Sequence, residues 1–163
     1  MIRLLSILSI LAAFALCNTA AANVIHGRVV GVSDGDSVTV LDAQETQYKI
    51  RLAGIDAPER AQAYGQKAKE SLSDLVFGKS VEVEWSKQDR YGRIVGMITL
   101  AGVDINLEQI KRGMAWHYKQ YQNEQSPEGR ITYAQSESQA RDKKLGLWRD
   151  PAPIEPAVFR QKK

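Results

Sequence analysis

The chain has 163 residues, of which 44% are hydrophobic and 25% are charged, and its formal net charge is +3 at pH 7. These values exclude an intrinsically disordered chain and favour one globular domain with its own core. The mild positive charge permits a polyanionic partner without requiring one.

The first 22 residues have the pattern of a cleavable export signal. Arg3 provides the positive start, residues 4–16 form an apolar run, and the alanines at 20–22 offer a cleavage site. The run is too short to span a bilayer comfortably, although an uncleaved anchor or a buried first helix would have a similar composition. We therefore expect cleavage near Ala22, and a secreted or periplasmic protein with no membrane association after signal removal.

The only cysteine, Cys17, lies inside this leader. A lipidated leader is less favoured, because Leu16 stands where lipidation normally requires a small residue. The mature chain would then contain no cysteine, which excludes disulfides and thiolate ligands. Any metal ion must be held by oxygen atoms or by the two histidines, His26 and His117, which match no catalytic position.

Three short antiparallel strands are predicted after the leader. Residues 24–32 are rich in β-branched side chains, and Gly27 within them suggests a bulge or bend. Residues 33–36 form a tight turn, because Asp-Gly between two β-rich runs is a strong hairpin signal. Strands over 37–41 and 48–52 follow, and the alternation in the latter puts its charged side chains on one face.

The pattern then becomes helical and returns to strands. Apolar residues at helical spacing predict a helix over 66–77, ended by Gly78. Alternating or apolar runs predict a fourth strand over 80–85 and a fifth over 94–100.

Two more helices and a tail complete the chain. Residues 105–113 should form a short helix, with Asn106 as its N-cap and Gln109 as the partner in a capping box. Residues 131–145 should form a polar third helix, and three prolines predict that residues 151–163 are an extended C-terminal tail.

This order of elements predicts a mainly β, α+β domain over residues 23–150. Five short strands, one helix after the third strand and two helices after the fifth fit a five-stranded Greek-key barrel of the OB type with three helices. Barrels of this class bind oligonucleotides on their faces and loops. One interpretation is therefore a non-catalytic nucleic-acid-binding module.

Two acids could share a metal ion at the edge of this barrel. Asp36 opens the second strand and Asp56 follows the third, so that pairing of these strands would bring their carboxylates together. Carboxylate and carbonyl ligands favour a hard cation such as Ca²⁺ or Mg²⁺. The alternative is that each aspartate serves only its own turn.

Two arginines and a glutamate accompany these acids. Arg51 lies on the polar face of the third strand, and Arg93 leads into the fifth. A guanidinium group can hold two phosphate oxygens and stabilise the extra charge of a five-coordinate transition state. Glu59 could orient or deprotonate a metal-bound water. The alternative for both arginines is solvation, or pairing with Glu82 and Glu84.

Three separated segments carry a resemblance to a known family. They are residues 34–38 (Asp-Gly-Asp-Ser-Val), 51–59 (Arg-Leu-Ala-Gly-Ile-Asp-Ala-Pro-Glu) and 89–93 (Asp-Arg-Tyr-Gly-Arg). In this order and spacing they resemble the hallmark segments of the staphylococcal nuclease (thermonuclease) family. Residues 106–113 and 136–148 resemble its later helices, so the resemblance covers essentially the whole mature chain.

The resemblance implies a Ca²⁺-dependent, sugar-non-specific endonuclease, with Mg²⁺ or another divalent ion as an alternative. Such an enzyme hydrolyses DNA and RNA at the 5′ P–O bond and leaves 3′-phosphate ends. We expect it to be a monomer. All five charged residues of the site are present in this chain, which favours the enzyme over the binding module.

The resemblance also implies residue roles. The metal ligands would be Asp36, Asp56 and the carbonyl of Ala57, and the catalytic residues would be Arg51, Glu59 and Arg93. The residues implied to bind substrate are Arg90, Tyr91, Trp116, Tyr118 and Lys119. Aromatic rings beside cations suit base stacking along a phosphate track, and core packing is the alternative for Trp116 and Tyr118. The stretch 60–64 is shorter than the corresponding loop of better-known relatives, so loop contacts to substrate should differ.

Overall fold

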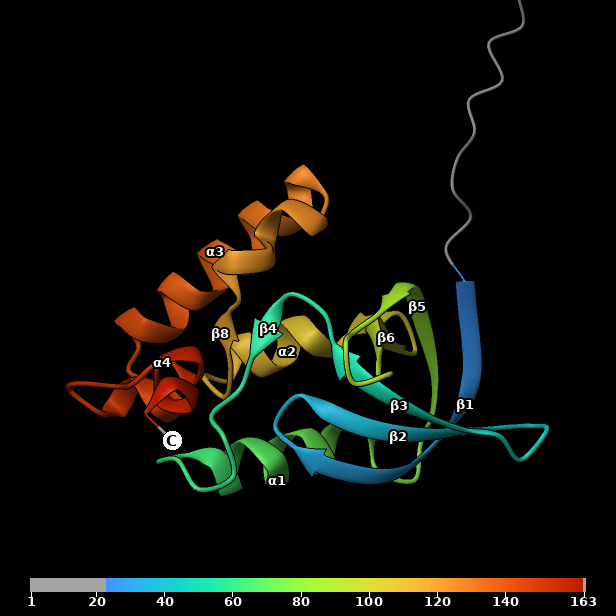
Figure 1. Cartoon of the computed structure of the whole chain (residues 1–163). Coiled ribbons are helices and arrows are strands. Elements are labelled where there is room, and N and C mark those ends of the chain that lie inside the picture. The colour runs from blue at the N-terminus through green and yellow to red at the C-terminus, as the bar shows by residue number, and fades with distance from the viewer. Residues whose placement is uncertain (1–22, 163) are drawn as a thin grey trace, which may run out of the picture.

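Five strands close into a barrel in the computed structural model of the protein, which describes residues 23–162 (Figure 1). The strands are β1 (Asn23–Asp34), β2 (Ser37–Asp42), β3 (Gln47–Leu52), β5 (Ser80–Gln88) and β6 (Ile94–Leu100). They pair in the order β1-β2-β3-β6-β5, and β5 returns to β1. All pairs are antiparallel except β3 with β6. This arrangement confirms the predicted OB-type barrel.

The parallel seam between β3 and β6 sets the position of the charged segments. Arg51 of β3 lies opposite Val95 of β6 and opposite Ser37 of β2. Arg93 immediately precedes β6, so both arginines reach the same end of the barrel. The predicted pairing of the second and third strands, on which the candidate site depended, is therefore present.

The hairpin predicted between β1 and β2 is confirmed, but the bulge predicted at Gly27 is wrong. Gly27 keeps regular register with both neighbouring strands, and the irregularities of β1 lie further along, within residues 29–34. A Cβ atom at position 27 would lie 2.6 Å from the carbonyl oxygen of Leu41. Glycine is required there because the neighbouring strand approaches closely.

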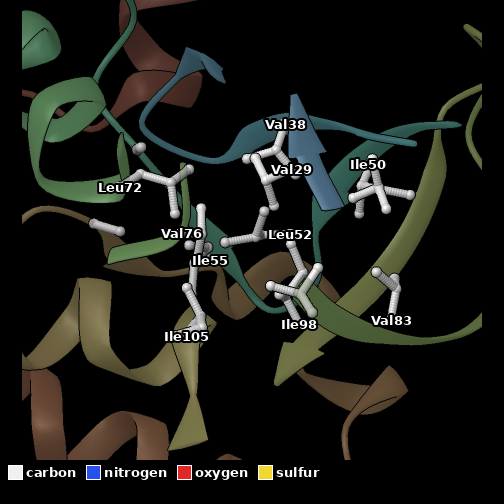
Figure 2. Packing of buried hydrophobic residues seen from close by; sticks show 14 of the residues in the cluster. Val29, Val38, Ile50, Leu52, Ile55, Leu72, Val76, Val83, Ile98 and Ile105 are labelled. Carbon is white, nitrogen blue, oxygen red and sulfur yellow. The ribbon is translucent and has the colours of Figure 1, made fainter. Parts of the chain in front are cut away.

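One hydrophobic core fills the barrel and continues under two helices, α1 (Gly65–Val76) and α2 (Ile105–Lys111). Figure 2 shows side chains from the strands gathered with Leu72 and Val76 of α1 and Ile105 of α2. Gly78 follows α1 with a φ of +74°, the left-handed conformation expected of a glycine at a helix C-terminus.

The cap of α2 differs from the prediction. Asp104, not Asn106, is the N-cap, and its side chain accepts the N–H of Leu107. Asn106 and Gln109 are fully buried instead of forming a capping box. Asp104 stands only two residues earlier and is an equally good capping residue, so the sequence offered both choices.

The two buried amides fasten the loops that carry the candidate site. Asn106 donates to the carbonyl of Ala53, just after β3, and Gln109 donates to the carbonyl of Gly35, just before Asp36. Buried backbone carbonyls are costly when unpaired, so these side chains hold both turns against the helix.

The C-terminal half adds a second, smaller core. The short strands β4 (Ile55–Asp56) and β8 (Trp116–His117) pair, and α3 (Pro127–Asp142) packs beside them. Helix α3 begins four residues before its predicted start, because Ser126 caps it and Pro127 occupies the first turn. Strand β7 (Val103–Asp104) and the 3₁₀ helices η1 (Lys119–Glu124) and η2 (Gly146–Arg149) complete this part.

The tail is not extended throughout, which corrects the prediction for residues 151–163. Pro156–Gln161 form a fourth helix, α4, with Pro156 in its first turn, where the fixed φ of proline favours a helix. Helix α4 (red in Figure 1) folds back towards β8 and the segment that leads into α1. The side chain of Gln62 donates to the carbonyl of Ile154 and fixes this return.

The structure does not describe the predicted leader, and it describes no membrane-spanning helix within residues 23–162. The predicted signal peptide over residues 1–22 lies outside the described residues. None of the helices within residues 23–162 is long and apolar enough to cross a membrane.

The buried amide of Asn106 yields a stability prediction. Asn106→Ala removes hydrogen bonds to Ala53, Gly96 and Ile98 and leaves those backbone groups buried. We expect it to lower the free energy of unfolding by about 2–4 kcal/mol, measured by urea denaturation. Gln66→Ala, on the exposed face of α1, is the control and should change the free energy of unfolding by less than about 0.5 kcal/mol. An unchanged midpoint for Asn106→Ala would contradict this account.

Candidate active site

Arg51 joins the two candidate metal ligands. Its Nη2 atom lies 3.1 Å from Oδ2 of Asp36 and 2.9 Å from Oδ1 of Asp56. Its Nη1 atom donates to the carbonyls of Leu52 at 2.8 Å and Ile55 at 2.9 Å. The sequence predicted that these three charged side chains would converge, and they do. The extra bonds to the backbone also make Arg51 a structural part of the loop after β3.

Asp36 is buried and well supplied with donors. Its Oδ2 atom accepts the N–H of Ala57 at 2.7 Å, and its Oδ1 atom accepts the hydroxyl of Ser37. Burial nevertheless raises the pKa of Asp36 to about 7, although Arg51 opposes the shift. The nearby charge of Asp34 raises this pKa further. The protein groups around Asp36 therefore do not fully compensate a negative charge there.

This donor set fits a hard divalent cation. The carboxylates of Asp36 and Asp56 are both buried and meet at one nitrogen of Arg51. Carboxylate and carbonyl oxygens are the ligands that Ca²⁺ and Mg²⁺ prefer. Residues 23–162 contain no cluster of three or more His, Cys, Asp or Glu side chains able to hold an ion. A bound cation would therefore complete its shell with other oxygens, and the resemblance implies the main-chain carbonyl of Ala57 as one of them.

Arg93 is held in place by Asp89, in a turn over residues 89–93. Oδ1 of Asp89 accepts the N–H groups of Tyr91 and Arg93, and Oδ2 accepts Nε of Arg93 at 2.8 Å. Nη1 of Arg93 reaches the hydroxyl of Ser37 at 3.3 Å, which links it to the Asp36 side of the site. The sequence alone assigned no role to Asp89. An aspartate that accepts the N–H groups of the residues following it is nevertheless a common turn motif.

The pKa of Asp89 is lowered in the folded protein. Burial acts to raise it, but the bonds from the backbone and side chain of Arg93 and from the Tyr91 N–H outweigh that effect. The ionised form of Asp89 is thus the one that stabilises the turn.

Glu59 has an unexpected partner. Its Oε1 atom lies 2.8 Å from Nη1 of Arg160 in α4. Arg160 also contacts Asp56, with Nη1 3.1 Å from Oδ1 and Nη2 3.0 Å from Oδ2. Sequence reasoning missed Arg160, because no local pattern connects a residue in a proline-rich tail with acids 101 and 104 residues earlier.

These residues line one cleft of about 680 Å³. The predicted site residues on its walls are Asp36, Arg51, Ala57, Glu59, Arg90, Tyr91, Arg93 and Tyr118. Asp56 does not line this cleft itself, but it contacts Arg51, which does. The cleft is also lined by residues that the sequence did not predict, among them Lys87 and Tyr121.

Aromatic rings stand at the mouth of the cleft. Tyr91 is 69% exposed, and the guanidinium of Arg90 lies 4.8 Å from its ring centre. Tyr118 and Tyr121 meet edge to face, with 4.9 Å between ring centres. Lys87 lies over Tyr121 at 5.2 Å. Rings beside cations therefore line this cleft, but of the predicted set Trp116, Tyr118 and Lys119 only Tyr118 is among them.

Two predicted substrate residues lie away from this cleft. Trp116 is buried, stacks edge to face on Trp148 with 4.4 Å between ring centres, and faces Arg141. The packing role that the sequence left open is the one that this geometry favours. Lys119 makes an ion pair of 2.8 Å with the buried carboxylate of Glu137.

Comparisons with known proteins identify a family and several relatives of this chain. The family described as "Staphylococcal nuclease homologue" matches residues 49–150. A Haemophilus influenzae protein named "Uncharacterized endonuclease" is 46% identical over 134 residues, which cover 82% of this chain and 72% of that protein. A protein of the same name from Escherichia coli is 41% identical over 140 residues, covering 85% of this chain and 87% of the relative. "Micrococcal nuclease" of Shigella flexneri is 38% identical, covering 83% and 80%.

The lowered pKa of Asp89 yields a pH-dependent prediction. A carboxyl group with a depressed folded pKa contributes stability above its ordinary pKa of about 3.9 and loses it as the pH falls through the lower folded value. Asp89→Asn should therefore be less stable than the parent at pH 7, and this difference should shrink below about pH 4. Thermal denaturation at pH 7 and pH 3 measures it, with the exposed Asp74→Asn as the control for loss of charge. A difference that stays constant with pH would contradict the role of Asp89.

Proposed function

The chain belongs to the staphylococcal nuclease family and is a nuclease, and we propose that it is an exported, Ca²⁺-dependent endonuclease that cleaves both DNA and RNA. Cleavage at the 5′ P–O bond leaves a 3′-phosphate and a 5′-hydroxyl. The observation that carries this proposal is the position of Arg51 between two buried aspartates, on the wall of a cleft that also holds Glu59 and Arg93.

The two arginines would bind the scissile phosphate. Arg93 is oriented by Asp89 and makes no hydrogen bond through Nη2 with residues 23–162, so that this end is available to a phosphate oxygen. Arg51 already touches both aspartates and would add its positive charge beside the same phosphate. Guanidinium groups of this kind stabilise the charge that develops on the equatorial oxygens in the transition state.

Glu59 would act on the attacking water. Its carboxylate borders the cleft beside Asp56, to which it is connected through Arg160. In this role it orients the water and accepts its proton, while the water oxygen bonds to phosphorus and the bond to the 5′ oxygen breaks. A divalent cation held by Asp36, Asp56 and the Ala57 carbonyl would supply a positive charge that binds the phosphate and activates water.

The rim residues would hold the nucleotide chain on either side of the scissile bond. Arg90 and Tyr91 line the cleft from the turn over residues 89–93, and Tyr118 and Tyr121 line it from the segment around η1. Stacking tolerates every base, and phosphate contacts do not read the 2′-hydroxyl. This mode of binding suits a monomeric enzyme that acts on both nucleic acids.

Export is proposed from the leader pattern of residues 1–22. The mature chain would start near Asn23, where β1 begins. N-terminal sequencing of the exported protein tests this cleavage site, and its recovery from the culture medium or from the periplasmic fraction separates a secreted from a periplasmic location.

The first functional prediction concerns the metal and the products. Residues 23–163 should cleave single-stranded DNA and RNA in Ca²⁺, stop when a chelator is added, and resume when Ca²⁺ is restored. The products should carry 5′-hydroxyl ends that polynucleotide kinase labels without phosphatase treatment. Binding without cleavage in any divalent ion would favour the OB-type binding module. Products with 5′-phosphate ends would contradict the bond that we propose is cleaved.

The second functional prediction concerns the residues. Glu59→Gln should lower kcat about 10²-fold or more through loss of the proton acceptor, and Arg93→Ala about 10²- to 10³-fold through loss of transition-state contacts. Circular dichroism should show an intact fold in both. Glu45→Gln and Arg28→Ala remove the same charges from exposed positions outside the cleft and are the controls. If both site variants cut as fast as the parent, the site is assigned wrongly.

A further inference from the structure

The C-terminal helix α4 enters the active site through one side chain. The guanidinium of Arg160 forms a fork on Asp56, with Nη1 to Oδ1 at 3.1 Å and Nη2 to Oδ2 at 3.0 Å. Its Nη1 atom also lies 2.8 Å from Oε1 of Glu59. The side chain of Asp56 is only 3% exposed, and Arg160 is one of the groups that cover it. One cation therefore bridges the proposed metal ligand and the proposed acceptor of the water proton.

This position conflicts with a divalent cation. Oδ1 of Asp56 already accepts from Arg51, and Arg160 adds a partner to each oxygen of the same carboxylate. Metal coordination uses the same oxygen lone pairs, and a guanidinium about 3 Å away would repel the ion strongly at a buried site. A cation on Asp56 would therefore compete with Arg160 for both oxygens of this carboxylate.

Apart from Arg160, α4 is only partly buried against the rest of the protein. The helix has six residues, and Pro156 is its only buried one. Ile154 is 45% exposed and Val158 is 41% exposed, so detachment uncovers little apolar surface at these positions. The prolines at 151 and 153 restrict the linker before the helix, which lowers the entropy lost when α4 docks again.

We propose that Arg160 is a latch: it holds α4 over the active site by occupying Asp56 and Glu59, and divalent-cation binding is coupled to release of this helix. The latch rests on the proposed function, because it assumes that the cation binds at Asp56. In the latched state Ala157, Arg160 and Gln161 form part of the cleft wall, so α4 also narrows the path of the substrate. Release would provide the metal ligand and open the cleft in a single event.

The latch lowers the apparent affinity of the site for its ion. If only the unlatched fraction binds, the apparent Kd is the intrinsic Kd divided by that fraction. Arg160 is 40% exposed, which weakens its ion pairs, but its partner Asp56 is buried and the contact is bidentate. We expect the latch to raise the apparent Kd roughly 3- to 30-fold. The corresponding free energy lies between that of an exposed ion pair and that of a buried charged hydrogen bond.

Calorimetric titration of Ca²⁺ into the mature protein tests the latch without a measurement of activity. Arg160→Ala should bind Ca²⁺ roughly 3- to 30-fold more tightly than the parent. Arg160→Lys should lie between them, because an ammonium group cannot form the bidentate fork. The matched control is Lys162→Ala, which removes the same charge from the end of the same helix, where its side chain makes no ion pair with residues 23–162. Its affinity should match that of the parent.

Hydrogen exchange reports the movement itself. In the parent, Ca²⁺ should speed amide exchange in α4, and in Arg160→Ala exchange there should be fast with or without Ca²⁺. Equal or weaker Ca²⁺ binding by Arg160→Ala, or exchange in α4 that ignores Ca²⁺, would overturn the latch. So would an unchanged Kd with a lower kcat at saturating Ca²⁺, which would make Arg160 a substrate contact.

The two proposals fail in different ways. If neither the parent nor Arg160→Ala binds Ca²⁺ and neither cleaves nucleic acid, the proposed function fails and the latch fails with it. If both proteins bind Ca²⁺ equally and both cleave, the latch alone is overturned.

Discussion

Two buried carboxylates must lie side by side in this protein, and Arg51 is the interaction that makes this tolerable. Charge is costly to bury unless it is paired, and one nitrogen of Arg51 contacts both Asp36 and Asp56. The other terminal nitrogen binds the backbone of the loop that carries Asp56. Electrostatic pairing and loop geometry thus depend on the same side chain, which is also proposed to bind phosphate.

The barrel explains why Arg51 can do this. The parallel pairing of β3 with β6 closes the sheet and brings the end of β3, the start of β2 and the start of β6 together. The amides of Asn106 and Gln109 then tie the adjacent turns to α2 from beneath. A fully satisfied buried polar network of this kind rigidifies what it joins. The site is preorganised by groups that take no part in its chemistry.

The sequence predicted the barrel and the convergence of its charges because both follow from local signals. Each of these signals spans only a few residues: the alternation of apolar and polar side chains in a strand, the hairpin turn, and each of the three charged segments. The cap of α2 was assigned wrongly, since Asp104 and Asn106 are both good caps and only packing decides between them. Trp116 looked equally suited to stacking on a base and to the core, where it meets Arg141. Arg160 could not be found, because its role arises only when the tail folds back across the molecule.

Charge balance connects the latch to the chemistry. Asp36, Asp56 and Glu59 contribute three negative charges, and Arg51 and Arg160, the two cations that contact them, return only two. Arg93 is neutralised by Asp89 and adds nothing to this balance. Burial raises the pKa of Asp36, and the nearby charges of Asp34 and Asp56 add to this effect against the opposing charge of Arg51. A divalent cation in place of Arg160 would neutralise the cluster, whereas a monovalent guanidinium cannot. On this balance, the three carboxylates would hold a divalent ion more strongly than the guanidinium of Arg160.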